Sequence, residues 1–88
     1  MRYELYNRLL EFDHDLGIPY CEKIVEEISE RIPGFTYKEV EEVYYREDKE
    51  YEIHVWYRVE NDGQEQQMVD YLRSCGLNEK YIIYHGND

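Results

Sequence analysis

Residues 51–59, YEIHVWYRV, give the clearest structural signal in this sequence. Apolar side chains such as Ile53 and Val55 alternate with polar or aromatic ones such as His54 and Trp56. Strict alternation is typical of a β-strand with one buried face, and we predict such a strand here. The apolar face comprises Tyr51, Ile53, Val55, Tyr57 and Val59, and the opposite face comprises Glu52, His54, Trp56 and Arg58.

Helical spacing of apolar residues predicts one helix on each side of this strand. Residues 19–32 begin with Pro19, which suits a first helical turn, and end before Pro33-Gly34. Residues 64–75 are followed by Gly76, a suitable C-terminal cap. The expected core stripes are Cys21, Ile24, Val25, Ile28 and Ile32 in the first helix, and Met68, Leu72 and Cys75 in the second.

Three further segments complete the predicted fold. Residues 81–85 favour a short strand. Residues 35–46 fit a bulged strand that forms a hairpin with residues 51–59, although Thr36 and Glu39 could instead form a helix-capping box. Residues 2–12 fit a strand that loses its alternation at Leu9-Leu10, and a helix is the alternative.

The favoured order is therefore β-α-β-β-α-β, a single acidic α+β domain spanning residues 1–88. This is the order of the ferredoxin-like fold, in which two helices cover one face of a four-stranded antiparallel sheet. If residues 2–12 are helical, the sheet has three strands instead. This fold has no fixed function, so function must be argued from particular residues.

The charge balance is the strongest functional signal. The 88 residues include 21 acidic and 10 basic side chains, which gives a net charge of −11. A small soluble domain usually carries a net charge of magnitude ~2–8. Successive turns of a helix are ~5.4 Å apart, which is close to the spacing of phosphates along a nucleic-acid strand. We therefore expect an inhibitor that mimics nucleic acid and occupies a basic, nucleic-acid-binding surface of another protein.

The residues expected to bind the partner are carboxylates, with aromatic side chains that add contacts insensitive to salt. The carboxylates are Glu22, Glu26, Glu30, Glu39, Glu41, Glu42, Glu47, Asp48 and Glu50, and the aromatic residues are Tyr44, Tyr45 and Trp56. In size and charge the chain is similar to the small inhibitors that phages and mobile elements direct against CRISPR effectors or restriction enzymes. No motif assigns it to a family.

The main rival is a homodimeric or adaptor domain. It would use the open sheet face, where we expect Trp56 beside His54 among tyrosines from neighbouring strands. An enzymatic or small-molecule-binding role for His54 and nearby acids is a weaker alternative. We expect no direct binding of nucleic acid, because the net charge of −11 repels phosphate.

The sequence indicates no catalytic residue, metal site or cofactor. His14, His54 and His85 have no metal-ligand spacing, and Asp15 is available to cap the helix that follows it. Cys21 and Cys75 lack metal-binding spacing and are expected to be reduced thiols of a cytoplasmic protein. A disulfide between them is the alternative. No apolar run approaches the ~20 residues of a membrane-spanning helix, and no signal peptide is evident.

Overall fold

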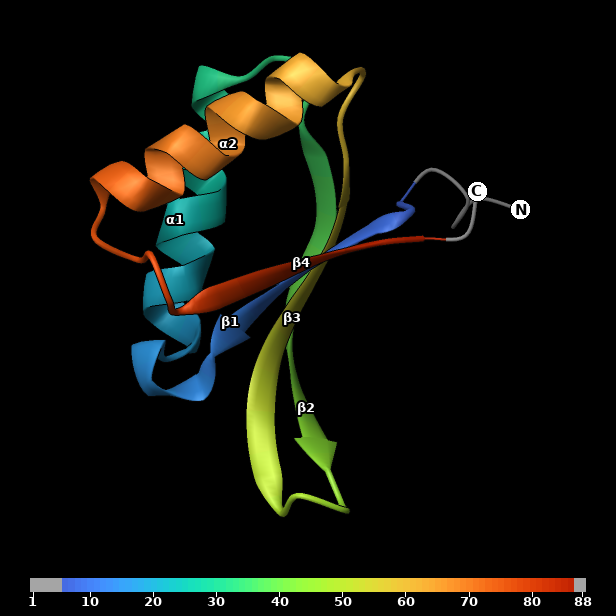
Figure 1. The fold of residues 1–88 in the computed structure, drawn as a ribbon, viewed down its shortest axis with the longest axis vertical. Helices are drawn as coiled ribbons and strands as arrows, with labels where there is room; N and C mark the ends of the chain where they lie inside the picture. Colours follow the sequence, from blue (N-terminus) through green and yellow to red (C-terminus); the bar gives the residue numbers. More distant parts are fainter. Residues whose placement is uncertain (1–5, 87–88) are drawn as a thin grey trace.

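The computed structural model describes residues 6–86 and has the predicted ferredoxin-like arrangement (Figure 1). The four strands form one antiparallel sheet in the order β2-β3-β1-β4, and both helices lie on the same side of it. The elements are β1 (Arg8–Asp13), the 3-10 helix η2 (His14–Leu16), α1 (Ile18–Arg31), β2 (Thr36–Tyr45), β3 (Glu50–Arg58), α2 (Asp62–Ser74) and β4 (Tyr81–His85).

The first described strand, β1, explains why alternation fails at Leu9-Leu10. Leu10 and Phe12 are fully buried beneath the helices, whereas Leu9 is on the opposite face of the sheet and is still 9% exposed. Both faces of this central strand are therefore partly apolar, which hides the period-2 pattern. The helical alternative is wrong for Arg8–Asp13, and residues 2–5 of the predicted segment lie outside the described residues.

Helix α1 begins without a side-chain cap. Its N-cap is Gly17, which has a φ of 82°, and Pro19 lies in the first turn as predicted. The expected capping role of Asp15 is wrong. The Asp13 carboxylate instead accepts a hydrogen bond of 2.9 Å from the Asp15 backbone N–H, which caps the short helix η2. The chain thus makes one short 3-10 turn between β1 and α1.

Strand β2 is bulged, as its broken alternation predicted. The pairing with β3 shifts between Tyr37 and Val40, and the capping-box alternative is wrong because Thr36 begins the strand. The β2–β3 hairpin projects beyond both helices (Figure 1). Tyr51 is therefore 47% exposed, although its alternation assigns it to the apolar face, and its ring packs 4.8 Å from that of Tyr44.

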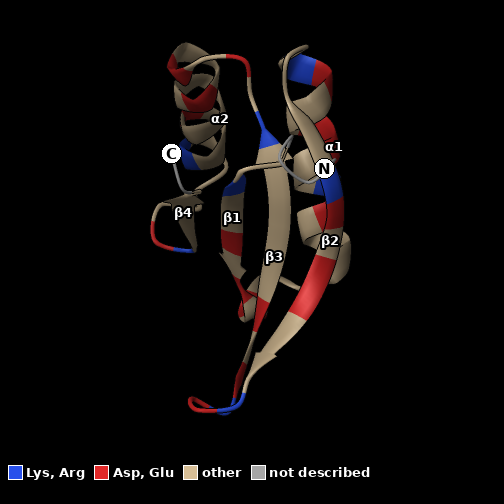
Figure 2. Ribbon diagram, turned by 90° about the vertical axis from the view of Figure 1, so that its right-hand side faces the viewer, with Lys and Arg blue, Asp and Glu red and all other residues tan. Residues whose placement is uncertain are grey.

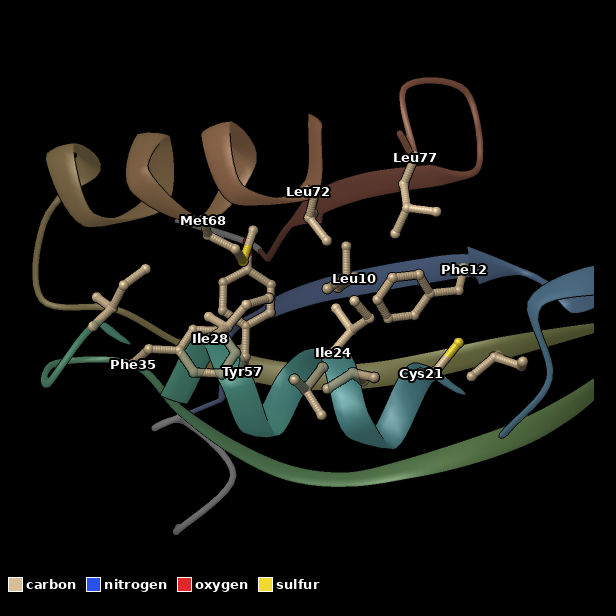
Figure 3. Close-up of a cluster of buried hydrophobic side chains, with 14 residues drawn as sticks. Leu10, Phe12, Cys21, Ile24, Ile28, Phe35, Tyr57, Met68, Leu72 and Leu77 are labelled. Carbon is tan, nitrogen blue, oxygen red and sulfur yellow. The ribbon is translucent and has the colours of Figure 1, made fainter. Parts of the chain in front are cut away.

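The core lies between the helices and the sheet (Figure 3). The predicted apolar stripe of α1 is buried throughout, from Cys21 to Ile32. Met68 and Leu72 of α2 point toward the sheet, and the rings of Phe35 and Tyr57 stack 5.3 Å apart. Gly76 follows α2 with a φ of 80°, the left-handed conformation expected of a C-terminal cap.

Two further findings bear on the environment of the chain. Both cysteines are free thiols, and Cys21 is buried whereas Cys75 is partly buried. The alternative of a disulfide between them is therefore wrong. Within residues 6–86, neither helix combines the length and the apolar character that a membrane crossing requires.

Candidate protein-interaction surfaces

The exposed side of α1 and the neighbouring edge strand β2 carry the first group of predicted carboxylates (Figure 2). Glu22 and Glu26 of α1 line a groove of about 530 Å³ together with Glu39 of β2. Lys23 and Lys38 also line this groove, so it is acidic but mixed in charge. Glu30 lies one helical turn beyond Glu26 and is exposed as well.

Tyr37, on the wall of this groove, responds to the local negative field. Burial raises the pKa of its hydroxyl, and the carboxylates of Glu26 and Glu22 raise it further. The carboxylates of Glu22, Glu26, Glu30 and Glu39 form no ion pair within residues 6–86. Among the residues described, these four carboxylates are thus unpaired, although the groove itself has only a small acidic excess, with three acidic and two basic side chains.

The remaining predicted carboxylates are not brought into that group. Glu41 lies opposite His54 and therefore on the uncovered face of the sheet. Glu42, the next residue, lies on the other side, where its carboxylate is 2.9 Å from Nε2 of His14. The remaining acids, Glu47, Asp48 and Glu50, lie at the exposed tip of the hairpin, close in sequence to Arg46 and Lys49.

The uncovered face of the sheet, which is turned toward the viewer in Figure 2, carries part of the predicted aromatic site. Trp56 is on this face as its alternation predicts, and it is 38% exposed. Tyr45 belongs to the same face, and its hydroxyl is 3.0 Å from Nε2 of His54. Tyr44 does not, because it lies opposite Tyr51 on the other side of the hairpin. Of the three predicted aromatic residues, Trp56 and Tyr45 thus share one surface.

The centre of this face is formed by residues that were not predicted from the sequence. Glu11 of β1 lies opposite His54 of β3 and opposite Ile82 of β4. Its Oε1 is 4.0 Å from Nε2 of His54, and its negative charge raises the pKa of the nearby Tyr84 hydroxyl. The side chains of Glu11 and His54 are only 12% and 11% exposed. The strand order, rather than any local motif, brings these residues together.

Two ionisable groups near Glu11 have a raised pKa. Burial raises the pKa of the Glu52 carboxyl, and the like charges of Glu11, Asp13 and Glu50 raise it further, against a small opposing effect of His14. The pKa of Tyr84 is raised by the charge of Glu11 first, and then by burial. Neighbouring carboxylates are among the causes of both shifts, which indicates that negative charges lie close together on this face.

A second carboxylate cluster, on the side of the sheet covered by α2, has a structural role. The side chain of Glu65 is 15% exposed and accepts hydrogen bonds from Arg8, from the hydroxyl of Tyr57 at 3.1 Å, and from His85 at 2.8 Å. Burial opposes ionisation of Glu65, yet the hydrogen bonds from His85, Arg8 and Tyr57 leave its pKa below the ordinary value. The cluster joins β1, β3, β4 and α2.

The three histidines occupy separate places. His14 pairs with Glu42, His54 contacts Tyr45 and Glu11, and His85 pairs with Glu65. Across residues 6–86, no group of three or more His, Cys, Asp or Glu side chains has a geometry that could hold a metal ion.

Comparisons with protein-family models, with curated proteins and with solved structures find no match to this chain. Two surfaces therefore supply the evidence on function, namely the acidic α1–β2 edge and the uncovered sheet face.

Proposed function

We propose that this protein is an inhibitor that binds a basic, nucleic-acid-binding surface of another protein by mimicking nucleic acid. The observation that supports the proposal most is the row of exposed, unpaired carboxylates at Glu22, Glu26 and Glu30 of α1, with Glu39 nearby on β2. Carboxylates four residues apart on a helix are neighbours that repel one another. A partner that supplies cations to this row would relieve the repulsion.

The proposed mechanism has two stages. The net charge of −11 attracts a basic surface over a distance and speeds encounter. The carboxylates then pair with Lys and Arg side chains that otherwise hold phosphates. Because exposed charges are screened over ~8 Å at physiological ionic strength, this binding weakens as salt is added. In this proposal the protein is a binding protein of the cytoplasm rather than an enzyme, and its free thiols fit a reducing compartment.

The test is to identify a partner and then to compete for it with nucleic acid. Immobilised protein is exposed to nuclease-treated lysate of its native host, and bound proteins are eluted either with salt or with duplex DNA or RNA. The proposal expects a basic protein that nucleic acid releases. It is overturned if the captured protein remains bound in saturating nucleic acid, or if it retains full nucleic-acid binding while the complex is intact.

Charge reversal locates the contact. Glu26→Lys with Glu30→Lys is expected to weaken binding of the captured partner by roughly 100-fold or more, because two close charge pairs become repulsive. Asp70→Lys with Glu79→Lys makes a matched control, since both residues are exposed and neither belongs to the α1–β2 edge. Equal losses in the two variants would mean that only the net charge matters and that no surface is shaped for a partner.

A homodimeric or adaptor domain is a second candidate, favoured by the exposed aromatic residues of the uncovered sheet face. Trp56 is 38% and Tyr84 47% exposed, and large exposed aromatic side chains are typical of protein–protein contacts. This candidate predicts that Trp56→Ala abolishes association while the charge reversals on α1 leave it unchanged. Sedimentation at increasing protein concentration separates the homodimer from the adaptor.

A further inference from the structure

The uncovered face of the sheet has apolar and aromatic side chains on three neighbouring strands. Leu9 of β1 lies between Trp56 of β3 and Tyr84 of β4 in the strand pairing. Ile82 and Tyr84 are 52% and 47% exposed, and Trp56 is 38% exposed. These side chains form an exposed apolar patch, in which Leu9 itself is only 9% exposed, and such a patch on a small domain indicates a contact with another molecule.

A carboxylate lies in the middle of this patch. Glu11 follows Leu9 on the same face of β1, so it is a diagonal neighbour of both Trp56 and Tyr84. Diagonal neighbours in an antiparallel sheet are ~7–8 Å apart, within reach of aromatic side chains. Glu11 is thus flanked by two rings, and Glu52 lies further along the same face beside Asp13. The face combines exposed π-surfaces with partly buried negative charge.

The contacts that Glu11 already makes do not neutralise it. Tyr84 is a diagonal neighbour of Glu11, but its phenol carries no positive charge. His54 lies 4.0 Å away, beyond hydrogen-bond distance, and its Nε2 is engaged with the hydroxyl of Tyr45 at 3.0 Å. Arg58, the residue that follows Trp56 on this face of β3, forms no ion pair within the described part of the chain.

We propose that this face docks a basic partner protein through an arginine side chain, whose guanidinium stacks on Trp56 and pairs with the carboxylate of Glu11. A guanidinium is planar, stacks on aromatic faces and donates two parallel hydrogen bonds to a carboxylate. Lysine offers only a compact charge with a stronger hydration shell, so arginine fits this combination better. The inference rests on the proposed function only for the basic character of the partner, and it adds the face and the side chain involved.

Charge complementarity selects this occupant over two others. A second copy of the chain would bring another −11 charge against a face that is itself acidic. A nucleic acid could stack its bases on Trp56, but its phosphates would meet Glu11, Glu52 and Asp13. Only a cationic protein surface satisfies the aromatic and the acidic parts of the face together.

Trp56 gives a direct probe, because it is the single tryptophan of the sequence. The full-length protein is titrated with a blocked hexa-arginine peptide while Trp56 emission is recorded, and hexa-lysine and hexa-citrulline peptides serve as controls. We expect a saturable change with hexa-arginine, a roughly 10-fold weaker affinity for hexa-lysine, and no binding of hexa-citrulline. Equal affinity for the arginine and lysine peptides would overturn the proposal.

Two charge-matched double variants separate this site from the α1–β2 edge. Glu11→Gln with Glu52→Gln is expected to weaken hexa-arginine binding at least roughly 10-fold, whereas Glu22→Gln with Glu26→Gln should weaken it less than about 3-fold, because only the first pair removes the direct contacts. The reverse ranking would overturn the inference and leave the proposed function standing. Release of the captured partner by nucleic acid, tested separately, decides the proposed function.

A third variant keeps the test valid if loss of Glu11 disturbs the fold. Trp56→Ala removes an exposed ring, and calorimetry should show a loss of roughly 10-fold or more in hexa-arginine affinity. Unchanged affinity overturns the proposal. Two other results would also overturn it: a homodimer that Trp56→Ala dissociates, or saturable quenching of Trp56 by a single-stranded oligonucleotide.

Discussion

Replacing Glu65 by Gln tests the most concentrated set of polar contacts in this fold. The carboxylate is 15% exposed and receives hydrogen bonds from three donors, Arg8, Tyr57 and His85. Gln keeps the shape of the side chain and one acceptor oxygen but removes the charge. The guanidinium of Arg8, itself 20% exposed, then loses its charged partner, and its remaining ion pair is the weaker contact of 3.4 Å with the exposed Asp62.

The expected cost follows from these contacts. A hydrogen bond to a charged group contributes about 1.5–3 kcal/mol, and the three bonds to Glu65 share one carboxylate, so their contributions do not add. The amide of Gln still accepts one bond. We therefore expect Glu65→Gln to lower the free energy of unfolding by about 2 kcal/mol near pH 7. A small domain has only about 5–15 kcal/mol in total, so urea denaturation resolves such a loss easily.

The pH dependence gives the sharper test. The pKa of Glu65 is lower in the folded state than its ordinary value of 4.5. A group of this kind stabilises the fold above its unfolded pKa, and the contribution is lost as pH falls through the folded pKa. The difference between wild type and Glu65→Gln should therefore be full near pH 7 and shrink below 4.5. A difference that stays constant between about pH 7 and about pH 3 would refute the assignment of an ionised, hydrogen-bonded Glu65.

Two controls accompany this measurement. Glu30→Gln removes an exposed carboxylate of α1 and should change the free energy of unfolding by less than about 0.5 kcal/mol. Tyr57→Phe removes one of the three donors, and a double-mutant cycle with Glu65→Gln should give a coupling of about 1 kcal/mol. Zero coupling would mean that the Tyr57 hydroxyl does not stabilise the ionised carboxylate.

Three further predictions concern the core and the backbone. Ile28→Ala should destabilise the protein by about 2–5 kcal/mol in urea denaturation, because this fully buried side chain would leave a cavity, and a loss below about 1 kcal/mol would contradict the packing described. Gly76→Ala should cost about 1 kcal/mol by the same measurement, since a φ of 80° strains any residue with a Cβ; a stabilised variant would contradict that conformation. Burial raises the pKa of the Cys21 thiol to about 12, so a thiol reagent should modify Cys21 only when the protein unfolds. Mass spectrometry measures the labelling, and equal labelling rates for Cys21 and Cys75 in the native protein would contradict the burial of Cys21.

Most of the fold could be predicted because the spacing of apolar residues along the sequence indicates which side chains are buried. The helices and the hairpin follow from apolar spacing, and a bulge was expected from the break in alternation around residues 40–42, next to its observed place between Tyr37 and Val40. The strand β1 was ambiguous because Leu9 and Leu10 bury on opposite faces, which removes the pattern on which the prediction depends. The exposure of Tyr51 could not be foreseen, because it results from the length of the hairpin relative to the helices rather than from its own neighbours.

The candidate sites could be predicted less completely. Trp56 and His54 were assigned to the correct face because both lie on one strand. Glu11 and Tyr84 were missed, since their meeting depends on β1 pairing with both β3 and β4. No local pattern specifies which strands are neighbours. Similarly, Glu41 and Glu42 are adjacent in sequence but lie on opposite faces of β2, so a cluster of acids along the chain does not make a cluster in space.

The division of the carboxylates between paired and unpaired groups is the main reason to look for a partner. Around α2 and the ends of β1 and β4, cations pair with acids: Arg8 with Glu65, and Lys80 with Asp13 at 3.8 Å. On α1, the exposed row Glu22, Glu26 and Glu30 has no such partner within residues 6–86. One lysine in that row would add about 0.2–0.5 kcal/mol per helical ion pair and still leave ample charge for solubility. Neither stability nor solubility therefore accounts for the row, and this is the reason for the proposal that it binds a cationic partner.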